Sequence, residues 1–311
     1  MKALDVALVG WFALSCFACV SGDDSIATDS GSDVTTNDAS DGSSPADATS
    51  EEAAGPFTPA SLDADGSLAL WLQATSSQIT TSNDVVEKWA DLSKNHNDAT
   101  NPTTGPVVDS AAVGGHDALH FQNVTLAIAD SASLRFGTDQ IFVAAVMKDT
   151  AGGGVAGFSK VQTKIGTGGT SFYQGFELIG TPGGIADGGS AKVALARFAA
   201  DLSDAGTSTL QSAQSDQPVF DDGNFHVVGA RRPNAGVLVV YADGAMVTNN
   251  ATEDDDISVA GIDVAVGAVH YGKVVQSVDG EIAEVIVVHS TIISDATVAN
   301  VFAYLKARYA L

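Results

Sequence analysis

The stretch Val-Leu-Val-Val-Tyr-Ala-Asp-Gly-Ala-Met-Val, residues 237–247, decides the fold class. Its two apolar runs flank Asp243-Gly244, a dipeptide that favours the tight turn of a β-hairpin. Alternating βαβ units would need helices between strands, and none is indicated there. The pattern predicts an all-β protein, an antiparallel β-sandwich or jelly roll. Further short apolar runs, bounded by turn residues, lie at 68–72, 85–92, 119–121, 141–147, 172–179, 193–198, 225–230, 262–266 and 282–288.

One α-helix is expected at the C-terminal end of the chain. Ser294 suits the N-cap, and Asp295 suits the positively polarised first turn. Lys306 and Arg308 fall in the last turn, where they complement the negative end of the helix dipole. We expect its apolar stripe to pack on the edge or back of the sandwich. The residues of this stripe recur at helical spacing and are Val298, Val301, Phe302, Leu305 and Tyr309.

Composition separates residues 20–56 from the rest of the chain. The whole chain has a net charge of −24, and residues 20–56 contribute nine acidic and no basic residues. That segment has almost no large apolar side chains, so it cannot bury enough surface to offset the entropy of ordering. We therefore expect a disordered acidic tether at 20–56 and one globular domain at 57–311. With 28 acidic and 13 basic residues, the domain still carries −15, which argues against nucleic acid as a partner.

Residues 1–19 are expected to form a signal peptide. Lys2 gives a positive start, and the apolar run of about 14 residues falls short of the roughly 20 needed to span a bilayer. The small residue before Cys19 resembles the cleavage site of bacterial lipoproteins, in which the new N-terminal Cys is acylated, although Cys16 stands where Leu is usual. Lipidation at Cys19 would anchor the protein to a bacterial membrane or the cell surface by lipid alone. Without it the protein would be secreted.

Several local patterns in residues 68–311 resemble the concanavalin A-like lectin/glucanase superfamily, and within it the bacterial laminin G-like domains. The most specific is the loop Trp-Ala-Asp-Leu-Ser-Lys-Asn-His-Asn-Asp at 89–98, which is similar to the pattern W-x-D-x-S-x-N-x-N. Phe225 stands where these domains usually have Trp. The resemblance implies a non-catalytic module that binds a glycan or an extracellular matrix component. Weaker similarities lie at 117–121, 222–228, 240–244, 280–285 and 304–311.

Aromatic side chains are candidates for stacking on sugar rings. Phe172, Tyr173 and Tyr271 could serve, with His270 beside Tyr271, although Phe and Tyr in strands more often belong to a core. An alternative is a structural or adhesive surface lipoprotein with a protein partner. A pair of exposed aromatics in one groove would favour the glycan, and a flat apolar patch would favour the protein. The ligand and the oligomeric state stay open at this point.

Two residue patterns could serve catalysis or metal binding, but each also fits a structural role. A retaining glycosidase needs two carboxylates about 5 Å apart, whereas Glu281 and Glu284 fall on opposite faces of a regular strand unless a bulge intervenes. We therefore expect no enzyme activity, with a glycoside hydrolase as the remaining alternative. His226 lacks an obvious second ligand nearby in the sequence and is interpreted as a hydrogen-bonded structural histidine.

The laminin G resemblance also implies a calcium site at the rim. Ca²⁺ takes six to eight oxygen ligands, which Asp91 and Asp98 in one loop and Asp254 and Asp256 in an acidic run could supply. Acidic runs are more often solvated loops, so this site is an expectation from the resemblance.

Overall fold

A computed structural model describes the chain from residue 56 onward, in several stretches. The chain divides into two units, Met1–Glu52 and Ala53–Leu311, and all described residues belong to the second. The predicted signal peptide, Cys19 and almost all of the tether lie outside them. The described stretches are 56–101, 104–149, 155–165, 171–181, 193–199, 211–215, 218–220, 222–233, 237–252, 255–271, 274–277 and 279–311.

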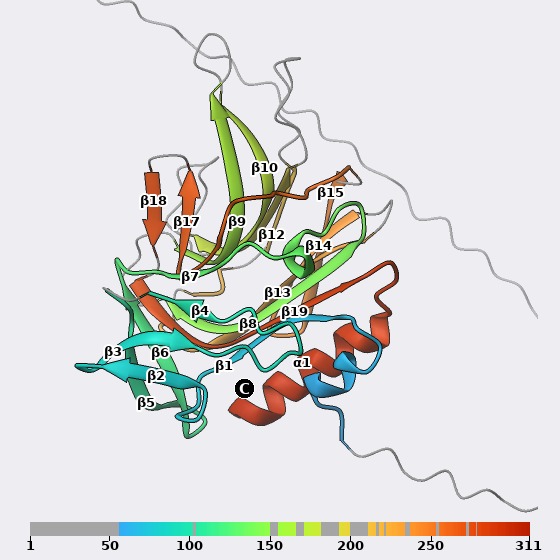
Figure 1. Cartoon of the computed structure of the whole chain (residues 1–311). Coiled ribbons are helices and arrows are strands. Elements are labelled where there is room, and N and C mark those ends of the chain that lie inside the picture. Colours follow the sequence, from blue (N-terminus) through green and yellow to red (C-terminus); the bar gives the residue numbers. More distant parts are fainter. Residues whose placement is uncertain are drawn as a thin grey trace, which may run out of the picture. The chain divides into compact units, whose positions relative to one another are not determined.

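The described chain forms β-strands, two short 3₁₀ helices and one α-helix (Figure 1). The prediction of an all-β fold with one C-terminal helix is confirmed. In chain order the elements are η1 (Pro59–Asp63), β1 (Leu68–Gln73), β2 (Ile79–Ser82), β3 (Val85–Trp89), β4 (Ala99–Thr100), β5 (Val107–Val113), β6 (His116–Gln122), β7 (Leu126–Ile128), η2 (Ala132–Leu134), β8 (Gln140–Asp149), β9 (Val155–Ile165), β10 (Ser171–Thr181), β11 (Val193–Ala199), β12 (Gln211–Gln214), β13 (His226–Arg232), β14 (Val237–Ala242), β15 (Ala245–Thr252), β16 (Val264–Val266), β17 (Ala268–Tyr271), β18 (Val274–Ser277), β19 (Asp279–Ser290) and α1 (Asp295–Tyr309).

Two antiparallel sheets make up the sandwich. In the first, β19 pairs with β8 along one edge and with β6 and β1 along the other, and β13, β14 and β15 follow β8. The second sheet runs in the order β4, β7, β16, β9, β10, β11, β12. Strand β3 pairs with both β5 and β4, so the hydrogen bonding continues from one sheet into the other.

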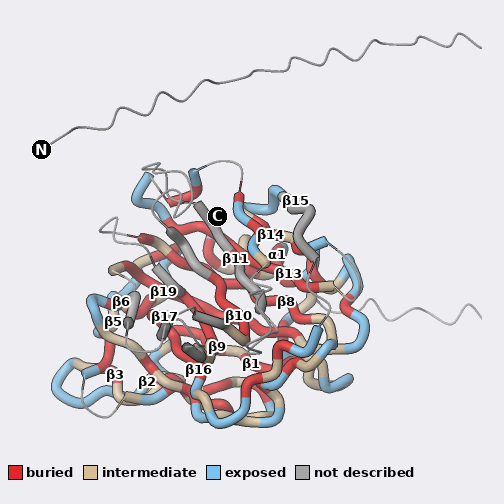
Figure 2. The backbone as a smooth tube through the Cα atoms, turned by 90° about the horizontal axis from the view of Figure 1, so that it is seen from above, coloured by how far each residue is buried: buried red, intermediate tan, exposed pale blue. Residues whose placement is uncertain are grey.

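Strand β8 shows how the layers are held together. Alternate residues such as Val143 and Met147 belong to the core between the sheets, whereas Phe142 and Val146 belong to a second core beneath the helix. Both faces of β8 are therefore buried, which explains its continuous apolar sequence. Figure 2 shows that buried residues follow the strands, while exposed residues gather at the loops.

The C-terminal helix packs on the outer side of the first sheet, as predicted (Figure 1). The Ser294 hydroxyl accepts a hydrogen bond from the Thr297 amide at 3.0 Å, which caps the helix, and all five predicted stripe residues are buried. The ring of Phe302 lies 5.6 Å from that of Phe142 between centroids. No helix in the described part of the chain is long and apolar enough to cross a membrane.

The hairpin expected around Asp243-Gly244 forms between β14 and β15. Asp243 and Gly244 have φ values of 49° and 85°, the left-handed conformation of a two-residue turn that matches the twist of the strands. Each of the ten predicted apolar runs coincides with a strand at least in part. Several polar strands were missed; among them is β9, in which Gly157, Ser159 and Lys160 interrupt the apolar pattern.

Candidate functional site

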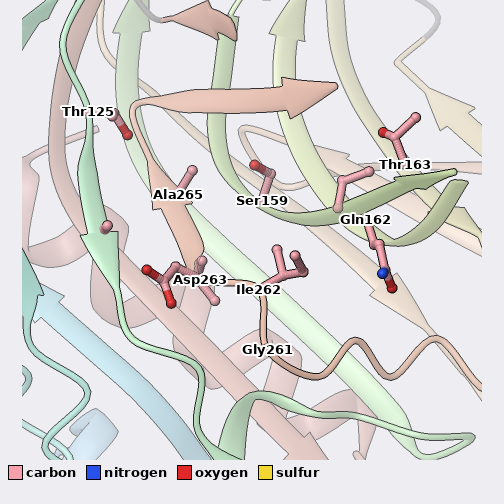
Figure 3. Close-up of a pocket in the computed structure, with 11 residues that line it drawn as sticks. Thr125, Ser159, Gln162, Thr163, Gly261, Ile262, Asp263 and Ala265 are labelled. Carbon is pink, nitrogen blue, oxygen red and sulfur yellow. The ribbon is translucent and has the colours of Figure 1, made fainter. Parts of the chain in front are cut away.

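A pocket of about 500 Å³ lies on the outer face of the second sheet, over strands β7, β16 and β9 (Figure 3). We call it the outer pocket. Leu126, Phe158 and Val266 of these strands point into the core, so their alternating neighbours point outward. The side chains that give the outer pocket its character are Thr125, Ala127, Ser159, Thr163, Asp263 and Ala265.

Small side chains on adjacent strands create the hollow. Ala265 of β16 lies directly opposite Ala127 of β7 on one side and opposite Ser159 of β9 on the other. Residues directly opposite each other in an antiparallel pair point to the same side of the sheet. A row of Ala, Ala and Ser thus leaves space where larger residues would fill the surface.

A sharp turn at Gly267 brings strand β17 along one edge of the outer pocket (Figure 3). Gly267 has φ +82°, and a Cβ atom there would lie 2.2 Å from the Phe121 ring, so the position requires glycine. The Gly267 amide donates to the Gly157 carbonyl at 3.0 Å, and the Ser159 hydroxyl donates to the Ala268 carbonyl at 2.8 Å. These two bonds attach β17 to β9.

Asp130 fixes the opposite wall of the outer pocket. Its carboxylate accepts hydrogen bonds from the Lys160 ammonium at 2.6 Å, from the Gly261 amide at 2.6 Å and from the Arg135 guanidinium. These bonds, with that from Arg135 the strongest, hold the pKa of Asp130 well below its usual range. The Asp130 amide in turn donates to Asp263 Oδ1 at 3.2 Å. Because Gly261 and Asp263 line the pocket, the Asp130 network positions that wall.

The polar groups of the outer pocket are mostly uncharged. The Thr125 and Ser159 hydroxyls donate to the Val266 and Ala268 carbonyls, so each leaves an acceptor oxygen for a ligand. Gln162 and Thr163 add an amide and a further hydroxyl, and Asp263 adds one carboxylate. Hydroxyls and amides can both donate and accept hydrogen bonds, as a ligand rich in hydroxyl groups requires. The site can orient such a ligand without a metal or a strong cation among its described lining residues.

One predicted aromatic lies on the same face as the outer pocket. Tyr173 of β10 lies directly opposite Thr163 of β9, and its side chain is half-buried. Phe172 is its neighbour on β10, and His270 and Tyr271 lie on β17, but the side chains of these three fall outside the described residues. Of the predicted aromatics, the structure therefore places the Tyr173 side chain beside the pocket. The row of small residues was not predictable, because Ala127, Ser159 and Ala265 become neighbours only through strand pairing.

The loop that carried the most specific family resemblance has a structural role. Asp91 Oδ1 accepts hydrogen bonds from the Trp71 and Ser93 amides at 2.9 Å, and Oδ2 accepts from the Ser93 hydroxyl at 2.7 Å and the Asn97 amide at 2.8 Å. Burial raises the pKa of Asp91, and these bonds oppose that shift. Asp98 accepts from the Asp91 amide at 2.9 Å and pairs with Lys88 at 2.5 Å.

The four aspartates proposed for calcium are not brought together as a set. Asp91 and Asp98 already bind protein donors, Asp256 Oδ1 accepts from the Ser258 amide at 2.8 Å, and Asp254 lies outside the described residues. Within the described residues no three His, Cys, Asp or Glu side chains form a group that could hold a metal ion.

The structure corrects the expected placement of Glu281 and Glu284. The register between β19 and β8 shifts between Ile282 and Glu284, and this bulge puts both carboxylates on the side of the sheet that faces α1. Glu284 accepts from the Tyr309 hydroxyl and the Trp71 indole, each at 2.7 Å, whereas Glu281 pairs with Lys148 at 2.7 Å. Both sheets separate this face from the outer pocket.

His226 is hydrogen-bonded at both ring nitrogens, consistent with a structural histidine. Nδ1 lies 2.6 Å from Asp243 Oδ2, and Nε2 lies 2.9 Å from Asp222 Oδ1. The expectation that no carboxylate lies nearby was wrong. Asp222 is four residues earlier in the chain, but Asp243 meets His226 only because the β14–β15 turn returns to the start of β13.

No protein-family model matches the sequence, and comparison with curated proteins finds no relative. Among solved structures, the binding domain of botulinum neurotoxin serotype G aligns with a TM-score of 0.50 and 9% identity over 77% of this chain and 51% of that one. The serotype D binding domain aligns with a TM-score of 0.50 and 11% identity over 80% and 53%. This chain therefore spans about half the length of those domains.

The fold is an antiparallel β-sandwich. At such low identity the likeness to the two toxin domains shows the fold alone. Domain 4 of the arabinanase AbnA from Geobacillus stearothermophilus, solved with arabinotriose, aligns at a lower TM-score of 0.47, with 12% identity over 75% of this chain and 97% of that domain.

Proposed function

We propose that this protein is a non-catalytic saccharide-binding module whose ligand occupies the outer pocket. The observation that carries the proposal is the hollow across β7, β16 and β9, about 500 Å³ in volume, whose polar groups apart from Asp263 are uncharged hydroxyls and an amide set among apolar side chains. Sugars present hydroxyl groups that donate and accept hydrogen bonds, so such a lining can satisfy them. Tyr173, on the same face, supplies an aromatic ring that can stack on a sugar.

The position of the carboxylates disfavours a glycoside hydrolase. Glu281 and Glu284 face the helix side of the first sheet, and Glu284 is fully buried among hydrogen-bond donors. Asp263 is the single carboxylate among the lining residues of the outer pocket, and the usual hydrolytic mechanism needs two.

A protein partner is supported less than a saccharide. Among the described residues, the exposed large apolar side chains are few and belong to different elements, whereas docking of a protein generally uses a contiguous apolar patch. These residues are Val107, Val237, Met246, Ile292 and Leu311.

The finer parts of the proposal concern family, calcium and location. The loop at 89–98 supports membership of the concanavalin A-like superfamily and its laminin G-like branch. We also propose that Asp254 and Asp256 supply some of the oxygen ligands of a calcium ion. Cys19 and the acidic segment 20–56 support an exported domain that is displayed from a bacterial membrane or surface by a lipid-anchored tether, with secretion as the alternative.

A glycan-array screen of the purified protein tests the proposal, with millimolar Ca²⁺ and again with a chelator. The pocket variant is Ala127→Tyr, which places a large ring over the floor of the hollow. The matched control is Thr80→Tyr, an exposed β2 position that belongs to another part of the same sheet system. Saturable binding to related sugars, lost in Ala127→Tyr and kept in Thr80→Tyr, is the expected result.

Two outcomes would count against the proposal. If no sugar on the array binds, with or without Ca²⁺, the saccharide proposal is wrong and a protein partner becomes the better hypothesis. Equal binding by wild type and Ala127→Tyr would place the sugar elsewhere on the domain.

A further inference from the structure

We infer that Asp263 determines the specificity of the outer pocket, so that it binds uncharged saccharides through adjacent hydroxyl groups and rejects saccharides that carry carboxylate or sulfate groups. This inference rests on the proposed function. It goes further by naming the class of ligand and the side chain that selects it.

Asp263 stands at the wall of the pocket with one carboxylate oxygen available. It lies directly before β16 and is exposed, and it is the single charged side chain among the lining residues. Oδ1 accepts the Asp130 amide at 3.2 Å, which holds the carboxylate in place. Within the described residues no donor bonds Oδ2. Figure 3 shows Asp263 at the start of the strand that carries Ala265.

The cations nearest to Asp263 are shared between its carboxylate and that of Asp130, which together balance their two positive charges. Lys160 is buried, and its ammonium donates to Asp130 at 2.6 Å and to the Leu134 carbonyl at 3.1 Å. Arg135 also pairs with Asp130. Asp130 thus bonds to both cations, and neither cation contributes a side chain to the pocket lining.

The next described cation along the sheet is also paired. Lys88 of β3 reaches the outer face through the cross-strand pairs Lys88–Thr100 and Thr100–Ala127, but its ammonium lies 2.5 Å from Asp98. Lys160, Arg135 and Lys88 therefore each have a carboxylate partner, and none of them is among the residues that line the outer pocket.

The net negative charge of the whole domain also disfavours binding of an anionic sugar. Residues 57–311 carry 28 acidic and 13 basic residues, so an anionic ligand meets repulsion from Asp263 and from the surrounding field. A neutral diol meets neither penalty, and its two hydroxyls can both donate to the carboxylate. A hydrogen bond to a charged acceptor is stronger than one to a neutral acceptor, so Asp263 favours the neutral sugar while it excludes the anionic one.

The test uses pairs of sugars in which one member is neutral and the other carries carboxylate groups, with the full-length chain. Lactose-based oligosaccharides with and without sialic acid form one pair, and galactan and polygalacturonate fragments form another. Binding is measured by calorimetry at low and at high NaCl for wild type, for the near-isosteric Asp263→Asn and for Asp109→Asn. Asp109 is exposed on β5 and does not line the pocket, so its variant removes the same charge elsewhere.

We expect wild type to bind the neutral member about tenfold or more tightly than the anionic member at low salt. The anionic sugar is repelled by Asp263 and so loses the charged hydrogen bond to its carboxylate, and that bond alone is worth about this factor. Asp263→Asn should lower affinity for the neutral sugar and bring the ratio close to one, and Asp109→Asn should leave the ratio near that of wild type. High salt should weaken the rejection of the anionic sugar. The thermal midpoint of each variant shows that it is folded.

Different outcomes separate this inference from the proposed function. If neutral sugars bind but Asp263→Asn keeps the wild-type ratio, or Asp109→Asn shifts it equally, the inference is wrong and the proposed function stands. If anionic sugars bind wild type as well as neutral ones, the inference is also wrong. If no sugar of either class binds, the proposed function and this inference are both wrong.

Discussion

Asp91 shows how one carboxylate organises a loop. Its four hydrogen bonds come from Trp71, Ser93 and Asn97, which tie the loop to β1 and close it on itself. The other residues of the motif have comparable tasks. Trp89 is fully buried in the core, and Asn95 donates to the Leu68 carbonyl at 2.8 Å. The residues that carry the family resemblance therefore stabilise the fold, and they reveal little about the ligand.

Replacing Asp91 by Asn should lower the free energy of unfolding by about 2–3 kcal/mol, because the new amide group would face donors that need an acceptor. Asp98→Asn is the control. It keeps an acceptor for the Asp91 amide and loses a part-exposed pair with Lys88, worth at most about 1 kcal/mol. Urea denaturation of both variants measures the difference. A smaller loss for Asp91→Asn than for Asp98→Asn would contradict this account of the loop.

The contact between the start of β13 and the β14–β15 turn is the clearest ionic link between elements. His226 joins Asp222, before β13, to Asp243 in the turn, and Lys306 of α1 donates to the Asp243 carbonyl at 2.6 Å. Burial lowers the pKa of His226, but hydrogen bonds and charges from Asp243 and Asp222 outweigh it, so the pKa is raised above 6.5. The protonated ring can donate to both carboxylates, whereas the neutral ring can donate to one.

The raised pKa predicts a pH dependence of stability. A histidine whose folded pKa lies above its unfolded pKa contributes stability that is fully present below about 6.5 and is lost as the pH rises through the folded value. Wild type should therefore lose free energy of unfolding as the pH rises above about 6.5, measured by urea denaturation at a series of pH values. His226→Gln should flatten this slope.

A comparison variant separates the link from other titrating groups. Asp222→Asn removes one of the two carboxylates while keeping the histidine, so it should reduce the slope without abolishing it. The same slope in wild type and His226→Gln would show that another group causes the pH dependence.

Elements with a strong local signal were predictable. Strand β8, helix α1 and the β14–β15 hairpin each carry their apolar spacing or turn chemistry within a few consecutive residues. Strands such as β9 and β12 carry Ser, Gln and Lys at many positions, because one of their faces forms the outer surface of a sheet. Their partners stabilise them through backbone hydrogen bonds, which leave little trace in the side-chain pattern.

At the scale of the whole molecule, the proposal joins a binding domain to an anchor. Residues 20–56 have nine acidic residues and no basic ones, so repulsion between like charges should extend the segment. A random coil of this length spans roughly 30 Å, enough to hold the domain clear of lipid headgroups.

The anchor is tested by Cys19→Ser, with Cys16→Ser as the matched control. Expressed in a bacterium that processes lipoproteins, wild type and Cys16→Ser should sediment with membranes, because several acyl chains give stable attachment. Cys19→Ser should not acquire lipid at that position. Fractionation and mass spectrometry of the N-terminus provide the measurement, and membrane-bound, acylated Cys19→Ser protein would refute the assignment.

The amino-acid sequence by itself determined the fold class, most of the long apolar strands, the hairpin at Asp243-Gly244 and the helix from Asp295 to Tyr309. These features depend on side-chain spacing and turn conformation among neighbouring residues, which a linear pattern records. The bulge in β19 could not be predicted from the sequence, because it is defined only by the pairing of β19 with β8.

Only the tertiary structure decided where the candidate site lies. Ala127, Ser159 and Ala265 are far apart in the chain and have no chemical feature that marks them as a site. They form the floor of the outer pocket because cross-strand pairing places them side by side on one face. Asp263 likewise becomes the charged group of that pocket through the Asp130 network. A hollow is a property of neighbours across strands, and the order of residues along one strand does not specify those neighbours.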